Sequence, residues 1–135
     1  ALMLINEGIA DNRTRILKPS SVKELFTPVW VYSPKLDNRD PSDSAHAYGA
    51  GINIISTAIG GDHMVNGVDD ITMFGHIGSA YGLMSACYID PVWKNGFAYA
   101  FNGTGGEQSI YSGRYSGRFI WHERTMSAIY HAIFQ

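Results

Sequence analysis

Two neighbouring segments of the 135-residue chain show a strand pattern with no polar face. In LMSACYID, residues 83–90, and GFAYAFNG, residues 96–103, small or apolar residues occupy both sets of alternate positions. Successive side chains of a strand point to opposite faces, so a half-exposed strand would be polar at every second position. The pattern therefore predicts a sheet that is buried on both faces. The short DPVWKNG segment between the two strands predicts that they are antiparallel.

Other segments predict the rest of an α+β domain. Strands are expected at 49–56 and 71–78, with Asn66-Gly67 as a hairpin turn between them. Residues 119–134 predict an amphipathic helix that lies on the sheet. The apolar stripe of this helix consists of Met126, Ile129, Tyr130, Ile133 and Phe134.

The N-terminal quarter predicts two short helices. Residues 1–8, ALMLINEG, are typical of the last two turns of a helix that Gly8 closes in the left-handed conformation. Pro19 is expected to open a second helix, with Ser21 and Glu24 as a capping box and Pro28 beyond its end. Residues 33–47 are expected to form a long surface loop. Because one face of the sheet lacks a helix and residue 1 is in mid-element, we expect further sequence upstream. A signal peptide is disfavoured by the short apolar stretch.

Composition narrows the class of protein. Hydrophobic residues make up 45% of the chain, enough for one packed domain. The formal charge of -2, without a long Lys or Arg run, argues against nucleic acid and anionic membrane as partners. The apolar runs are too short to span a membrane. The single cysteine, Cys87, is predicted to be a buried structural thiol, which leaves the redox compartment open.

Residues 74–82, FGHIGSAYG, are unusual for a strand because they contain three glycines. Glycine weakens a strand, so this run indicates a turn, a bulge or a place where something approaches the backbone closely. A lone strand histidine such as His76 is more often structural than catalytic.

The surrounding sequence resembles a known family. The run FGHIGSAYGLMSACYIDPVWKNGFAYAFNGTG is similar to the third motif of the serine β-lactamase, penicillin-binding protein and related esterase superfamily, which carries a Lys-Thr-Gly or His-Thr-Gly box. The segment LMLINEGIADNRTRILKPSSVKEL is similar to a helix, turn and R-I-L-x-P-x-S-V segment of that superfamily. The resemblance implies that residues 1–135 are the C-terminal portion of one β-lactamase/transpeptidase-like domain, an antiparallel sheet covered by helices.

The resemblance also implies a site on this strand. Ser79 would offer its backbone N–H to the oxyanion, and His76 would orient a substrate carboxylate or help to pass a proton. Substrate would lie against Gly75, Ile77, Gly78 and Tyr81. Ile77 departs from the usual threonine, which weakens hydrogen bonding to a carboxylate and favours esters or other amides over β-lactams and D-Ala-D-Ala peptides.

The implied activity is hydrolysis of an ester, amide or β-lactam-type bond through an acyl-enzyme, on a small-molecule or peptide-like substrate. The nucleophile would lie in the N-terminal part of the same protein, and no metal or organic cofactor is implied. Self-association stays open, and the resemblance favours a bacterial periplasmic or secreted location. The alternative is a catalytically inactive scaffold or binding module of the same fold.

Three other features of the sequence are not expected to form functional sites. Ser20-Ser21-Val22-Lys23 matches the letters of the S-x-x-K nucleophile motif, but it lies on a short helix in a segment that the resemblance assigns elsewhere. Residues 103–108, GTGGEQ, lack the lysine of a phosphate loop and predict a flexible turn. The remaining histidines share no metal-ligand spacing; they are His46, His63, His122 and His131.

Overall fold

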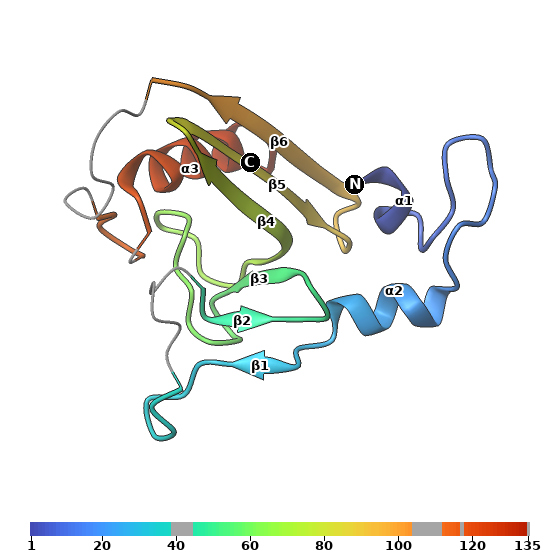
Figure 1. Ribbon diagram of the computed structural model, residues 1–135, viewed down its shortest axis with the longest axis horizontal. Coiled ribbons are helices and arrows are strands. Elements are labelled where there is room, and N and C mark those ends of the chain that lie inside the picture. Colours follow the sequence, from blue (N-terminus) through green and yellow to red (C-terminus); the bar gives the residue numbers. More distant parts are fainter. Residues whose placement is uncertain (39–44, 104–111, 117, 135) are drawn as a thin grey trace.

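The centre of the molecule is an antiparallel six-stranded sheet whose strands neighbour one another in chain order (Figure 1). The computed structural model describes residues 1–38, 45–103, 112–116 and 118–134. With its helices, the sheet gives the predicted α+β architecture. The strands are β1 (Trp30–Val31), β2 (Ala47–Tyr48), β3 (Asn53–Ser56), β4 (Thr72–Ala80), β5 (Leu83–Asp90) and β6 (Asn95–Phe101), and the helices are α1 (Leu2–Ile5), α2 (Pro19–Phe26) and α3 (Ile120–Phe134).

The β4–β5–β6 meander agrees best with the sequence. Strand β5 has the predicted bounds, and a short turn joins it to the antiparallel strand β6, as expected. Asp90 stabilises that turn, because its Oδ1 accepts hydrogen bonds from the backbone N–H groups of Val92 and Trp93. The alternating pattern was strong here because each strand spans seven or more residues.

The region before β4 differs from the prediction. Residues 49–56 are not one strand, because the N–H of Gly49 bonds to the carbonyl of Ile52 and turns the chain between β2 and β3. Asn66-Gly67 does not join two strands directly, so the hairpin prediction is wrong. It lies within residues 57–71, and the N–H of Asn66 donates instead to Ser127 Oγ on α3. A tertiary contact therefore holds this turn.

Helix α3 covers one face of the sheet and completes the main core. Met126 is fully buried among the side chains of that face, and burying a side chain of this size stabilises the fold by about 1.5–3 kcal/mol. Ile129, Tyr130 and Phe134 pack against the same cluster, as predicted. Ile133, which was expected in the stripe, is 48% exposed. The core face carries Met73, Ile77, Met84, Ala86, Tyr88, Phe97 and Tyr99.

The opposite face of β4–β6, here called the open face, is not buried along its length. Cys87 is exposed, so the prediction of a buried thiol is wrong. Helix α2 covers one end of this face, where the rings of Phe26 and Phe74 lie 4.4 Å apart. Beyond that end, the side chains are small or exposed, so within the described residues one face lacks a covering helix along most of its length, as expected. The open face carries Phe74, His76, Gly78, Ala80, Leu83, Ser85, Cys87, Ile89, Ala98 and Ala100.

The two N-terminal helices differ from the prediction: α1 is shorter, and α2 has a different N-cap. Helix α1 is a single turn that ends at Ile5, although Gly8 has the predicted positive φ of 92°. A Cβ on Gly8 would lie 2.2 Å from the carbonyl oxygen of Leu17, so glycine is required there. Helix α2 starts at Pro19 as predicted, but its N-cap is Lys18, without a side-chain cap. The Ser21/Glu24 capping box is therefore wrong.

Two predicted loops lie partly outside the described residues. These are the 33–47 loop, at residues 39–44, and the 103–108 turn, beyond Gly103. Among the helices of the described ranges, none has the length and apolar character needed to cross a bilayer.

Candidate functional site at the edge of β4

Among the described strands, the second half of β4 pairs with β5 alone. β4 pairs with β5 from Phe74 to Ala80, but its pairing with β3 ends at Gly75. The N–H of Thr57 bonds to the carbonyl of Ile71, which fixes the odd-numbered residues of β4 as those whose backbone groups point toward β3. The N–H groups of Ile77 and Ser79 therefore point away from β5, at the edge of β4 beyond the end of β3.

The imidazole of His76 lies at the same edge. Its Nδ1 is 2.5 Å from the carbonyl oxygen of Ile77. A carbonyl oxygen only accepts hydrogen bonds, so Nδ1 donates and, in the neutral ring, Nε2 keeps its lone pair. The hydroxyl of Tyr48 on β2 lies 3.4 Å from Nε2. The exposed His76 ring thus presents a basic nitrogen.

The two glycines beside His76 have different surroundings. A Cβ on Gly75 would lie 2.0 Å from the carbonyl oxygen of Cys87 and 2.7 Å from Tyr88, so close packing against β5 accounts for glycine there. A Cβ on Gly78 would meet the Ser85 hydroxyl at 2.7 Å, and that hydroxyl can rotate away. Packing therefore requires glycine at 75 more strictly than at 78.

Tyr81 lies at the tip of the β4–β5 hairpin. Tyr81 and Gly82 both have positive φ, 51° and 81°, as in a type I′ turn that joins adjacent strands. The Tyr81 side chain is fully exposed. The structure thus places His76, Ile77, Gly78, Ser79 and Tyr81 along one edge and hairpin, and it places Gly75 where β3 is still paired.

A buried polar network lies on the core side of the sheet. Arg118 and Asp62 form an ion pair with 2.5 Å between Nη2 and Oδ2, and both side chains are 2% exposed. Tyr88 donates to Asn53 Oδ1 at 2.6 Å, and burial raises the pKa of Tyr88. Burial lowers the pKa of Arg118, but the Asp62 carboxylate and Tyr88 together more than offset this, so the net shift is upward. The network ties the β3–β4 connection to the segment before α3.

His122 extends this buried polar region along α3. Its Nδ1 lies 2.6 Å from the Tyr99 hydroxyl, whereas its buried Nε2 has no hydrogen-bond partner among the described residues. Burial lowers the pKa of His122 to about 4, and the positive charge of Arg118 adds to the effect. Burial raises the pKa of Tyr99. His122 is therefore neutral near pH 7, and its burial leaves it unsuited to contact a substrate.

Glu123 holds the segment before α3. Its buried carboxylate accepts hydrogen bonds from the N–H groups of Arg114, Tyr115 and Ser116, at 2.7–3.0 Å. A Cβ on Gly113 would lie 2.1 Å from Glu123 Oε2, so glycine allows this close approach. A carboxylate bound by several N–H groups is a structural anchor.

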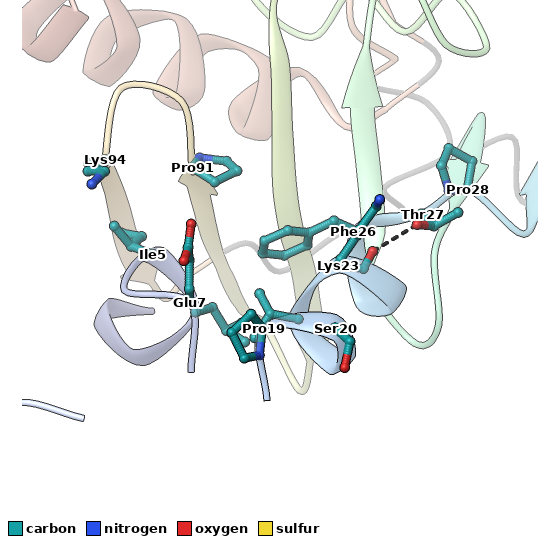
Figure 2. Close-up of a pocket in the computed structure, with 12 residues that line it drawn as sticks. Ile5, Glu7, Pro19, Ser20, Lys23, Phe26, Thr27, Pro28, Pro91 and Lys94 are labelled. Carbon is teal, nitrogen blue, oxygen red and sulfur yellow. Dashed lines mark hydrogen bonds between the residues drawn. The ribbon is translucent and has the colours of Figure 1, made fainter. Parts of the chain in front are cut away.

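A cavity of about 600 Å³ lies away from the β4 edge, between α1, α2 and the β5–β6 turn (Figure 2). Ser20 and Lys23 of the S-x-x-K sequence both line it, and neither His76 nor Ser79 does. The structure does not bring this motif and the β4 edge to one cavity.

The sequence missed the residues that link distant segments. These residues carry no local motif, and most of their partners lie far away in the sequence: 28 residues for Tyr48 and His76, 35 for Asn53 and Tyr88, and 56 for Asp62 and Arg118. The partners of Glu123 lie seven to nine residues before it. One weak signal for Glu123 was an acidic residue in the first turn of a predicted helix. Within the described residues, no three His, Cys, Asp or Glu side chains are grouped to hold a metal ion.

Comparisons of the chain with protein-family models, with curated proteins and with solved structures found no match.

Proposed function

We propose that this chain forms one wall of the acyl-transfer site of a serine hydrolase of the β-lactamase/esterase type. The observation that carries the proposal is the edge of β4, where the basic nitrogen of His76 and the N–H of Ser79 occur three residues apart beyond the end of β3. An acyl-transfer site needs a proton acceptor and an N–H donor close to one carbonyl group.

In this proposal the nucleophile is a serine hydroxyl outside residues 1–135. Its oxygen attacks the carbonyl carbon of the substrate, and the negative charge that forms on the carbonyl oxygen is stabilised by the N–H of Ser79. A lysine or tyrosine from the same region takes the serine proton. The tetrahedral intermediate then collapses, the bond from the carbonyl carbon to the leaving oxygen or nitrogen breaks, and the leaving group takes up a proton. Water later attacks the acyl-enzyme and releases the acid and the free serine. His76 Nε2 helps to transfer the proton, a role that the Nδ1 contact with Ile77 favours over binding a carboxylate.

The bond class follows from the side chains at the edge. Ile77 has no hydroxyl and its side chain packs against the core cluster, so this position offers no side-chain donor to a substrate carboxylate. An ester or an amide without a required carboxylate fits this edge better than a β-lactam does. A scaffold without catalytic activity is the second candidate, and the small side chains of the open face favour it, because a flat apolar surface can receive another protein element.

The decisive experiment compares two variants of Ser79 in the full-length protein. Ser79→Ala keeps the N–H and should change hydrolysis of a p-nitrophenyl ester by less than a few-fold. Ser79→Pro removes the N–H but leaves the β4–β5 hydrogen bonds intact, so turnover should fall by about 10²–10³. Melting curves of both variants establish that they are folded.

Two results would contradict the proposal. A folded Ser79→Pro variant with full activity would place the chemistry elsewhere. If the wild-type protein neither hydrolyses esters nor reacts with fluorophosphonate or penicillin probes, the scaffold is the better explanation. Ser20→Ala is the matched serine control, and it should leave probe labelling unchanged.

A further inference from the structure

The cavity between α1, α2 and the β5–β6 turn is built from three separate parts of the chain. Its volume of about 600 Å³ is within the range of sites that bind small molecules. Figure 2 shows side chains from all three parts directed toward one space. The lining residues are Leu4, Ile5, Glu7, Pro19, Ser20, Val22, Lys23, Phe26, Thr27, Pro28, Pro91 and Lys94.

The inner surface of this cavity is apolar and well supported. Ile5 and Val22 are 7% and 4% exposed, so both are anchored in the fold. Phe26 is fixed by its ring contact with Phe74 on β4. Pro19 and Pro91 add rigid apolar surface at α2 and at the β5–β6 turn. Such a surface favours an aliphatic ligand, because contact with it removes apolar area from water.

The charged lining residues are unevenly balanced. Lys23 on α2 and Lys94 on the β5–β6 turn provide two ammonium groups, and Glu7 provides one carboxylate. All three residues line the cavity and are exposed to solvent. The lining therefore carries a net charge of +1, whereas the whole chain has a formal charge of -2. This local excess of positive charge complements one negative group.

From these observations we infer that the cavity binds a medium-chain aliphatic carboxylate. The chain of the ligand lies on Ile5, Val22 and Phe26, and its carboxylate lies at the opening with Lys23 or Lys94. This site is separate from the β4 edge, because His76 and Ser79 do not line the cavity. The inference therefore does not depend on the proposed hydrolase activity.

The test uses octanoate as the probe and the full-length protein, with binding measured by calorimetry and by amide NMR shifts. Octanoate should bind at millimolar or lower concentration and shift amides of α1, α2 and residues 91–94. Hexanoate is two CH₂ groups shorter and should bind about fifteenfold more weakly, because each buried CH₂ changes affinity about fourfold. Octylammonium, with the same chain and opposite charge, should bind at least about fivefold more weakly than octanoate.

Two pairs of variants locate the site. Lys23→Met combined with Lys94→Met should weaken octanoate binding about tenfold, whereas Lys35→Met, outside the cavity, should not. Ser20→Trp should fill the opening and abolish binding, whereas Ser21→Trp, the next residue on α2, should retain it. Melting curves check that the variants are folded.

Three outcomes would overturn the inference. The first is no octanoate binding at millimolar concentration. The second is equal affinity for octanoate and octylammonium. The third is octanoate binding that survives both the double lysine variant and Ser20→Trp, because the ligand would then lie elsewhere on the protein.

Discussion

The two faces of the β4–β6 sheet are both largely nonpolar, yet only the core face is buried along its length. On the core face, Met73 and Tyr88 are fully buried in the cluster that also contains Met126 of α3. On the open face, Cys87, Ala98 and Ala100 are exposed. The difference lies in the size of the side chains, because large ones interlock with a helix and gain more from burial than small ones. Low polarity at alternate positions therefore does not by itself predict a second helical layer.

The faces also differ in how polar groups are held. Behind the core face, the polar side chains of Asn53, Asp62 and Arg118 bond to one another out of water. At the edge of the open face, His76 is exposed and contacts Tyr48 at a longer distance. We therefore expect the stability of the fold to depend on the buried polar network. Any catalytic chemistry is expected at the exposed edge of β4.

The largest expected effect is the loss of Arg118. Arg118→Met removes one partner of a buried ion pair and leaves the Asp62 carboxylate without its counter-charge. The free energy of unfolding should fall by about 3–5 kcal/mol, measured by urea denaturation. The double variant Asp62→Leu with Arg118→Met should recover much of this loss. If Arg118→Met alone changes stability by less than about 1 kcal/mol, the buried network does not stabilise the core face.

The next effect is a pH dependence that comes from His122. Its pKa is lowered to about 4 in the folded protein, so between pH 6.5 and about 4 the unfolded chain binds a proton that the folded protein does not. Stability should therefore fall as pH decreases through this window, by about 2–3 kcal/mol in total. Denaturation of wild type and His122→Gln at several pH values isolates the effect. Parallel pH profiles for the two proteins would contradict it.

A matched glycine pair tests the two faces directly. Gly75→Ala directs its methyl group at the Cys87 carbonyl and Tyr88, so it should cost about 1–3 kcal/mol. Gly78→Ala on the open face meets the rotatable Ser85 hydroxyl and should change stability by less than about 0.5 kcal/mol. Thermal melting of both variants gives the comparison. Equal losses would mean that β4 is packed equally tightly on its two sides.

The sequence predicted the elements whose signal is local and repeated. The β5 strand and the stripe of α3 follow from periodicity over many residues, and Pro19 marks the start of α2. The strands β1 and β2 could not be predicted from periodicity, because two residues are too few to show a period. The approach of Tyr48 to His76, and of Asp62 to Arg118, depends on how distant segments fold together. No spacing rule could have given either contact.

The smallest effect on stability gives the most direct test of the open face. Cys87 is exposed there, so a thiol reagent such as DTNB should react with it in the native protein, and Cys87→Ser should change stability by less than about 0.5 kcal/mol. The matched control places the only cysteine one residue earlier, as Ala86→Cys with Cys87→Ser. Ala86 is 4% exposed on the core face, so that thiol should react only after denaturation. If the native Cys87 thiol reacts as slowly as the control, another element covers this face, and the contrast between the two faces fails.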